Sequence, residues 1–332
     1  MRKKTPIITE RGIMRRLAST RQPFHDNYYA MYSSVLGGIV TNPVLMTVPV
    51  DDHMVHRGDG VFESFKCCGG SLYNLRSHLE RLQQSMEPLA MEIPCPMEEM
   101  VELVCDTVRA GGRRDALVRL LVSRGPGGLS VNPYDSQRPQ IYIVAYYLPP
   151  PFMQSHPQGA RIETSSIPVK PAFFARVKTC NYLPNVLMKK EAVDRGVDFM
   201  AGFDPSGFLA EGATENIAIV SADGYLASPF AAHILTGTTM LRVTELARPL
   251  VESGFLEGIR QRNITRADLR AAREVLILGT TVNVTAVVEY DGKPVGAGRP
   301  GPVYEKLSAL LMEDMTANSE MLTPVFEERR PQ

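Results

Sequence analysis

The chain has 332 residues, of which 44% are hydrophobic and 22% charged, enough for a large core in one or two domains. Its 36 basic and 36 acidic residues leave no net charge, so the composition gives no reason to expect a nucleic acid or an anionic membrane as a partner. No apolar run approaches the ~20 residues of a membrane-spanning helix, and five cysteines without CxxC spacing indicate a reducing cytoplasm rather than a disulfide framework or a zinc site.

The N-terminal segment is strongly basic. Residues 1–22 hold seven Lys or Arg but only one acid, Glu10, and lack the apolar core of a signal peptide. Pro6 and Pro23 limit any long helix, so we expect residues 1–28 to form a solvated basic extension. An Arg-rich, acid-poor segment is also typical of organelle targeting, and that alternative stays open.

The next part of the chain predicts two helices on a sheet. Residues 36–70 are broken by Gly and Pro and predict short strands. Residues 75–86 carry apolar side chains at helical spacing, with Ser77 and Glu80 as a capping box. A second helix, with Pro at its start and Gly at its end, is expected over residues 96–111.

Two strands, over residues 116–123 and 140–148, flank a Gly- and Pro-rich loop. Three consecutive prolines at 149–151 then favour a stiff, extended path, and we place a domain boundary there. The resulting division is a basic extension (1–28), a smaller α+β domain (29–148), a proline-rich linker (149–157) and a larger α+β domain (158–332).

Strands and helices alternate irregularly beyond the linker. The expected elements are, in chain order, a strand at 162–169, a helix at 183–195 ended by Gly196, two strands within 199–220 around a turn at 204–207, a helix at 238–247, strands at 275–278 and 284–290, and a helix from 303 onward. This order is typical of a mixed α+β fold and not of a doubly wound sheet.

Two segments place a cation where packing alone does not require one. Residues 56–63 (HRGDGVFE) precede the helix that holds Arg81, and a guanidinium matches a phosphate bidentately, although an isolated helical Arg is more often solvated. In residues 177–183 (VKTCNYL), Lys178 has apolar neighbours, and burial lowers the pKa of a lysine so that its amine can attack an aldehyde. That setting is absent at three other lysines, Lys170, Lys189 and Lys190.

Hydroxyl side chains recur in two further segments, residues 234–239 (ILTGTT) and 278–281 (LGTT). A helix start offers unpaired N–H groups and the positive end of the helix dipole, so phosphate binding at Thr239 and Thr280 has a physical basis. Plain capping of the helix by a threonine is the alternative.

These segments, together with residues 209–216 (LAEGATEN), resemble the class IV aminotransferases, or fold-type IV enzymes, over residues 30–312. The resemblance implies their two-domain α+β architecture, with pyridoxal 5'-phosphate (PLP) as cofactor in the larger domain and Lys178 as the Schiff-base lysine. Glu211 would pair with the pyridine nitrogen and keep the ring protonated as an electron sink. The other implied cofactor contacts are Arg81, Thr238, Thr239 and Thr280 at the phosphate, Tyr182 near the 3'-oxygen and Leu235 against the ring.

Simpler interpretations apply to several of these residues. A surface ion pair is the alternative for Glu211, and a buried aromatic anchor is the alternative for Tyr182. His53 and His56 form an HxxH pair without a third ligand, so we expect no metal site. Residues 296–301 match GxGxxG, but they follow a hairpin and contain a proline, which indicates a loop.

The substrate carboxylate needs a cation, and the sequence leaves its identity open. The Arg and His that trap it in D-amino-acid transaminases of the best-known type are replaced by Leu129 and Val131. We expect Arg57, then Arg119, to take over, with Lys66 as a third cation and the Thr281 backbone as a further contact. These four are the candidate substrate-binding residues.

The stretch at 52–58, with residues 178–185, looks closest to a plant-like subgroup of D-amino-acid transaminases and aminodeoxychorismate lyases. We therefore expect ping-pong transfer of an amino group between an amino acid, with D-amino acids favoured, and a keto acid such as pyruvate or 2-oxoglutarate. The alternatives are an aminodeoxychorismate lyase that releases pyruvate and, from the loop at 128–133 and Arg119, a branched-chain L-amino-acid aminotransferase. A non-catalytic PLP-binding protein is disfavoured because Lys178 and Glu211 are both present. The resemblance also implies a homodimer.

Overall fold

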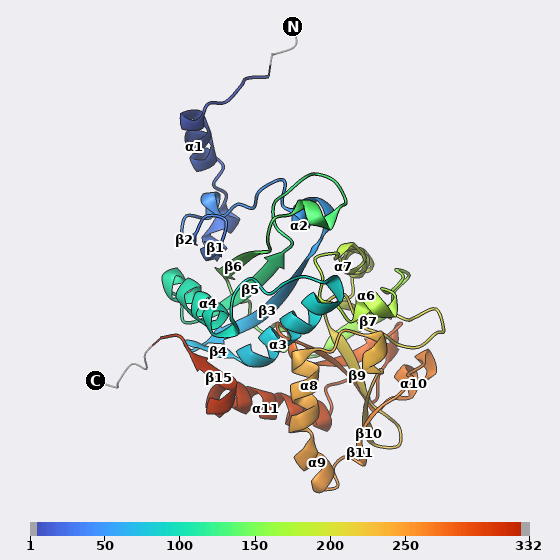
Figure 1. The fold of residues 1–332 in the computed structure, drawn as a ribbon. Coiled ribbons are helices and arrows are strands. Elements are labelled where there is room, and N and C mark those ends of the chain that lie inside the picture. The colour runs from blue at the N-terminus through green and yellow to red at the C-terminus, as the bar shows by residue number, and fades with distance from the viewer. Residues whose placement is uncertain (1–4, 327–332) are drawn as a thin grey trace, which may run out of the picture.

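A computed structural model describes residues 5–326 as two β-sheets with helices packed against them (Figure 1). The first sheet has the strand order β15 (Leu322–Pro324), β4 (Ser71–Tyr73), β3 (Gly60–Cys68), β5 (Ala116–Ser123), β6 (Gln140–Tyr146), β1 (Tyr28–Ser33) and β2 (Gly38–Val40). All of its neighbouring strands are antiparallel.

Two amphipathic helices cover the first sheet. Helix α3 (Leu75–Met86) packs on β3, and α4 (Met97–Gly111) packs on β1 and β6. Leu79 and Leu82 of α3 are buried in the same core as Phe65 of β3. This packing fixes α3 along its length and, with it, the position of Arg81.

The second sheet is mixed. Its strand order is β11 (Gly258–Gln261), β10 (Tyr225–Ser228), β9 (Asn216–Val220), β12 (Glu274–Gly279), β13 (Asn283–Tyr290), β7 (Ala160–Thr164) and β8 (Phe199–Ala201), with β14 (Lys293–Pro294) beside β13. Three of its strand pairs are parallel: β10 with β11, β13 with β7, and β7 with β8. Helix α8 (Thr238–Leu246) packs on β12, α11 (Pro302–Ala317) on β13 and α8, and α7 (Leu183–Arg195) on β8.

The end of the described chain returns to the first sheet, where β15 pairs with β4. Just before it, Asp314 of α11 accepts hydrogen bonds from Tyr73 of β4 at 2.5 Å and from Arg242 of α8 at 2.9 Å. A buried carboxylate thus ties the two sheets together. The domain division at 149–157 stays a prediction, and β15 lies with the sheet of the smaller domain.

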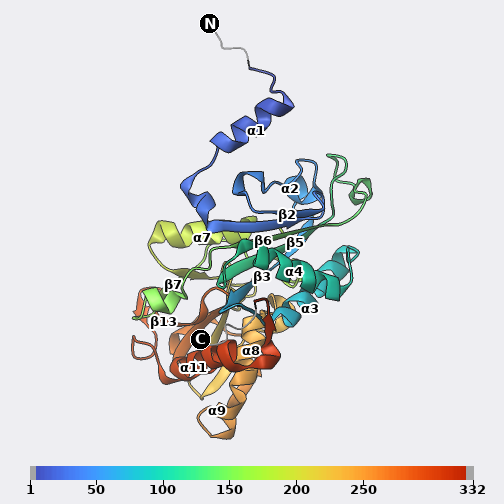
Figure 2. The ribbon, with the colours of Figure 1, turned by 90° about the vertical axis from the view of Figure 1, so that its left-hand side faces the viewer.

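Six further α-helices complete the described chain: α1 (Glu10–Ser19), α2 (His53–Arg57), α5 (Phe152–Ser155), α6 (Ala172–Ala175), α9 (Arg248–Glu252) and α10 (Arg266–Ala271). Helix α1 stands apart from the sheets, and none of its residues is buried (Figure 2). This helix is therefore solvent-exposed, and it lies between Pro6 and Pro23. No helix within residues 5–326 has the length and apolar character needed to cross a membrane.

The irregular α+β order is confirmed, and so are the helix at 183–195 and the strand at 116–123. The capping box of Ser77 and Glu80 is wrong. Helix α3 begins at Leu75 after Asn74, whose left-handed backbone (φ 53°) makes no side-chain cap. The N–H of Asn74 donates instead to Met321 O at 2.7 Å, a contact from a segment far along the chain.

The strand expected at 162–169 ends earlier, at Thr164. Beyond this point, Ser165 and Ser166 both hydrogen-bond the carboxylate of Glu191 on α7, each hydroxyl at 2.6 Å, and the pairing with β8 ends at Thr164. The segment at 199–220 holds two strands as expected, but β8 is only three residues long and β9 starts at Asn216.

Candidate active site

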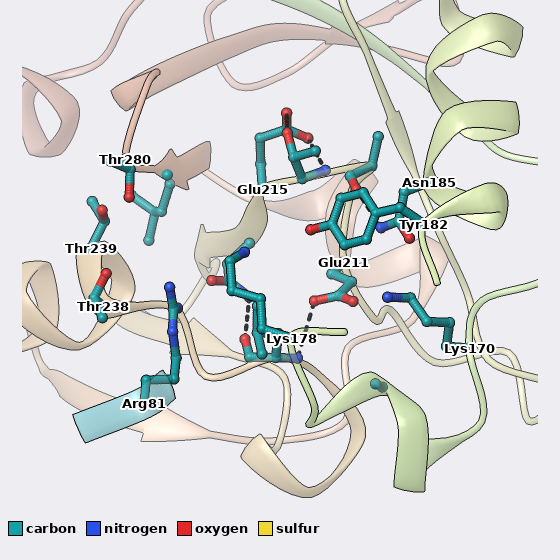
Figure 3. A pocket seen from close by; sticks show the side chains of 18 of the residues that line it. Arg81, Lys170, Lys178, Tyr182, Asn185, Glu211, Glu215, Thr238, Thr239 and Thr280 are labelled. Carbon is teal, nitrogen blue, oxygen red and sulfur yellow. Dashed lines mark hydrogen bonds between the residues drawn. The ribbon is translucent and has the colours of Figure 1, made fainter. Parts of the chain in front are cut away.

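A cavity lies where α3, the start of α8 and the second sheet meet (Figure 3). Its lining includes every residue that the sequence predicted as a cofactor contact: Arg81, Lys178, Tyr182, Glu211, Leu235, Thr238, Thr239 and Thr280. The fold therefore gathers in one place segments that are far apart in the chain.

Lys178 lies in a short extended segment that is hydrogen-bonded to β3. The Phe62 N–H donates to Lys178 O at 3.0 Å, and the Cys180 N–H donates to Gly60 O at 2.8 Å. The segment is thus anchored to the first sheet, while α7, which follows it, packs on the second. Lys178 consequently sits at the junction of the two sheets.

The Lys178 amine has an apolar environment. Its Nζ lies 4.7 Å from the centroid of the Phe62 ring and 5.9 Å from that of Tyr182. Burial, followed by the charge of Arg81, lowers the pKa of Lys178 to about 8. An appreciable fraction of the amine is then neutral near physiological pH, which nucleophilic attack on an aldehyde requires.

Arg81 is held by a buried carboxylate that the sequence interpretation missed. Its Nε and Nη2 donate to the two oxygens of Glu63 at 2.8 and 2.7 Å. His78 Nδ1 lies 2.7 Å from Glu63 Oε2. Burial alone would raise the pKa of Glu63, but the charge and hydrogen bonds of Arg81, with those of His78, outweigh it and lower the pKa to about 2. The motif GDGVFE therefore supplies an anion that orients Arg81, a role visible only once strand and helix are packed.

Three threonines line the cavity beside Arg81 (Figure 3). Thr238 and Thr239 open α8, and Thr280 follows β12. His78 Nε2 lies 3.2 Å from Thr238 Oγ1, which links this helix start to Glu63. A cation, hydroxyl groups and the N–H groups of a helix start are the donors that a phosphate group needs.

Glu211 lies on the other side of Lys178 from these threonines (Figure 3). The Leu235 N–H donates to its Oε2 at 3.1 Å. Burial raises the pKa of Glu211 to about 7, against the lowering effects of that hydrogen bond and of the charges on Lys170 and Lys178. A carboxyl group with this pKa is poised to pair with a protonated ring nitrogen, whose charge would favour the ionised form.

Lys170 also lines the cavity, which corrects the expectation that it lacks a buried setting. Its Nζ lies 4.8 Å from the centroid of the Tyr182 ring, and burial lowers its pKa while the charge of Glu211 opposes that change. Figure 3 shows its amine directed toward Glu211. The strand expected at 162–169 ends at Thr164, so an irregular segment brings Lys170 to this position.

The four predicted substrate residues lie outside the lining of this cavity. Arg57 is exposed, and its guanidinium donates to the carbonyl oxygens of His56 and Leu129 at 2.8 and 2.9 Å. Arg119 of β5 is exposed as well, with its guanidinium carbon 5.2 Å from the centroid of the Phe62 ring. Since that ring also contacts Lys178, Arg119 lies one side chain away from the amine.

Lys66 and Thr281 complete this set. Lys66 is buried on β3 and donates to Asn283 Oδ1. Thr281 is half-buried in the turn between β12 and β13. The predicted groups for the substrate carboxylate are therefore two exposed cations, Arg57 and Arg119, the buried Lys66, and the turn at Thr281.

The donor set fits a phosphorylated aromatic aldehyde such as PLP. Lys178 stands between Glu211 on one side and Arg81 with the threonines on the other (Figure 3). The amine could bond to an aldehyde carbon, the carboxylate could accept from a ring N–H, and the opposite end could hold a phosphate.

Comparison with known proteins gives consistent results. The family model "Amino-transferase class IV" matches residues 60–290. The chloroplastic D-amino-acid transaminase of Arabidopsis thaliana is 36% identical over 311 residues, which is 93% of this chain and 82% of that protein. A putative branched-chain-amino-acid aminotransferase of Methanocaldococcus jannaschii is 35% identical over 262 residues, 78% of this chain and 88% of that protein.

Solved structures agree with these relatives. A T.th. branched-chain amino acid aminotransferase with pyridoxamine 5'-phosphate superimposes with a TM-score of 0.82 at 29% identity, covering 90% of this chain and 99% of that one. The same enzyme complexed with N-(5'-phosphopyridoxyl)-L-glutamate gives a TM-score of 0.80 at 30% identity, with the same coverage.

Proposed function

The chain belongs to the class IV aminotransferases, whose family model it matches over residues 60–290, and we propose that it transfers amino groups between D-amino acids and 2-keto acids with PLP held on Lys178. The observation that carries this proposal is a buried lysine flanked by Glu211 and by the Arg81–threonine group in one cavity. The identity with the Arabidopsis D-amino-acid transaminase supports the D-preference.

PLP, when bound, supplies an aldehyde that links to amines and an electron sink that stabilises charge on the substrate Cα. The protein supplies the rest. Lys178, with its lowered pKa, would bond to the aldehyde and, once displaced by a substrate amine, move a proton as a general acid and base. Glu211 would hold the ring N–H, and Arg81, fixed by Glu63, would hold the phosphate.

Substrate recognition needs a further cation. We assign binding of the substrate carboxylate to Arg119, because Arg119 contacts the Phe62 ring next to Lys178. Arg57 is the second choice. The N–H groups of the turn at Thr280 and Thr281 are further donors, and Thr280 itself lines the cavity.

A panel of D- and L-amino acids with pyruvate or 2-oxoglutarate tests the proposal. D-alanine or D-glutamate should change the cofactor absorbance in the first half-reaction, and the keto acid should restore it. A faster reaction with L-leucine or L-valine would favour a branched-chain aminotransferase instead. Pyruvate released from aminodeoxychorismate without an amino acceptor would favour the lyase.

We also propose a cytoplasmic homodimer. The five cysteines are free thiols, in keeping with a reducing compartment. Two segments that expose apolar side chains, α2 and the loop at 124–139, are joined by the Arg57 bond to Leu129 O, and they form the surface that would meet a second subunit. Targeting by the basic N-terminal segment remains the alternative for localisation.

A further inference from the structure

Lys66 is a buried cation without an acidic partner among the described residues. Its relative exposure is 5%, and its one side-chain hydrogen bond goes to the neutral amide of Asn283. Burial lowers the pKa of Lys66 to about 8, so the amine stays largely protonated near pH 7. An isolated charge in a protein interior is costly unless an anion pairs with it.

A small second cavity shows where such an anion could be. Lys66 lines it together with Thr238, Thr239 and Thr280. The same three threonines line the larger cavity that holds Lys178. One wall of hydroxyl side chains therefore separates the Lys66 amine from the place proposed for a phosphate group.

The charges at this end of the cavity also favour an anion near Lys66. The guanidinium of Arg81 is paired through two hydrogen bonds with the Glu63 carboxylate, so their charges largely cancel. Burial lowers the pKa of His78, against the opposing hydrogen bond and charge of Glu63. A phosphate carrying close to two negative charges would then be stabilised by the buried amine of Lys66, which has no carboxylate partner among the described residues.

We propose that Lys66 is a positioning residue for the phosphate of PLP: it supplies positive charge from behind the threonine wall and, through Asn283, fixes the turn that presents Thr280. This inference rests on the proposed function, since it presumes PLP in the larger cavity. It departs from the role expected from the sequence, in which Lys66 binds the substrate carboxylate.

The test compares PLP with pyridoxal, which has the same ring and aldehyde but no phosphate. Dissociation constants for both are measured on cofactor-free protein by quenching of intrinsic tyrosine fluorescence. Lys66→Met should weaken PLP about tenfold or more while leaving pyridoxal unchanged, and Lys66→Arg should restore most of the PLP affinity. Lys190→Met, which removes an exposed lysine on α7, is the matched control.

Thermal stability gives a second readout. Removing an unpaired buried charge should leave the cofactor-free Lys66→Met protein at least as stable as wild type, while the stabilisation by added PLP should shrink. If Lys66→Met does not fold, Lys66→Gln keeps a donor for Asn283 without the charge and replaces it.

Two results would overturn the inference. An unchanged ratio of PLP to pyridoxal affinity would remove the phosphate role, and a raised KM for the amino acid alone would return Lys66 to the substrate. Failure of the wild-type protein to bind PLP at all would refute the proposed function itself, so the two failures are distinguishable.

Discussion

At the scale of single residues, the reactivity of Lys178 depends on its surroundings. A solvated lysine with a pKa near 10.4 is almost wholly protonated at pH 7.5. Burial beside Phe62 and the charge of Arg81 lower the pKa of Lys178 to about 8, which raises the neutral fraction by about a hundredfold. The apolar wall and the phosphate-binding cation thus also activate the amine.

We predict that the holoenzyme is yellow and that borohydride fixes the cofactor to Lys178. Mass spectrometry of the digested protein locates the adduct. Lys178→Ala should abolish turnover, because the reacting amine is lost. The protein should stay folded, since the contacts of this amine among the described residues are with the rings of Phe62 and Tyr182. Lys170 is the informative competitor, since it lines the same cavity, and an adduct on it would refute the assignment.

Glu211 gives a prediction about pH. In the cofactor-free protein, burial raises its pKa from 4.5 to about 7. Since the folded pKa lies above the unfolded one, the stability from this group is full below about pH 4.5 and falls as the pH rises toward 7. Glu211→Gln should therefore gain on the order of 2 to 3 kcal/mol over wild type at pH 8 and little at pH 4.5.

Urea unfolding of the cofactor-free proteins at the two pH values measures this difference. The exposed Glu80, changed to Gln, is the control and should show no such gain. A gain for Glu211→Gln that is equal at both pH values would contradict the assigned shift.

Arg119 can be separated from Arg57 by kinetics. Losing a charge-assisted hydrogen bond to a carboxylate costs roughly 1.5 to 3 kcal/mol, or about ten- to over a hundredfold in kcat/KM. Arg119→Met should show this loss with PLP affinity unchanged, and Arg57→Met should show a smaller one. Arg76→Met, an exposed position on α3, is the control. Full activity of both variants would leave the turn at Thr280 and Thr281 as the carboxylate site.

At the scale of elements, the start of α8 is positioned by contacts made at a distance from the cavity. Arg242 of α8 binds Asp314 of α11 through Nε at 2.9 Å and Nη2 at 2.5 Å. Asp314 in turn accepts from Tyr73 of β4 and from Asn318. Thr238 and Thr239 are at the start of the same helix. The buried carboxylate of Asp314 therefore also fixes the position of the proposed phosphate site relative to β4.

We predict that Asp314→Asn destabilises the protein by about 3 to 5 kcal/mol, since it leaves Arg242 half-paired in a buried site. PLP affinity should fall as well, because α8 loses its tie to α11. Glu245→Gln is a close control: it removes the exposed carboxylate that Arg242 also binds, at 2.7 Å. Equal unfolding midpoints for the two variants would show that the buried Asp314–Arg242 pair contributes no more to stability than a surface ion pair.

The sequence predicts elements well where their signals are local. The helix at 183–195 has its proline near the start and Gly196 after its end, and both boundaries are confirmed. Helix α2 was missed because its start depends on Asp52, which is held by Ser123 of β5 and Tyr142 of β6. No local pattern reveals such partners.

The same distinction applies to the site. Lys178, Glu211 and the threonines belong to motifs, so the sequence alone singles them out as candidates. The partnership of Glu63 with Arg81 and the position of Lys170 beside Tyr182 depend on how α3, β3 and the segment after β7 pack. The sequence predicts a binding role for the charge of Lys66, but its placement behind the threonines depends on the fold.

At the scale of the whole molecule, one loop exposes several large apolar side chains. The loop at 124–139 exposes Leu129, Val131 and Tyr134 by 64%, 77% and 90%. Helix α2 is bound to this loop through the His53 N–H, which donates to Gly125 O at 3.1 Å. Exposed apolar side chains on a loop held in this way favour a protein–protein contact.

We predict that the protein is a homodimer in which this loop packs against the second subunit beside its cavity. Val131→Asp should shift the mass measured by light scattering toward the monomer and lower turnover, because a charge buried in the contact would be unpaired. Phe255→Asp, an exposed aromatic position in the other part of the molecule, should change neither. Circular dichroism should show that both variants keep their fold. A wild-type protein that is monomeric and fully active at working concentration would exclude the dimer, and a dimeric Val131→Asp protein with unchanged kinetics would place the contact on another face.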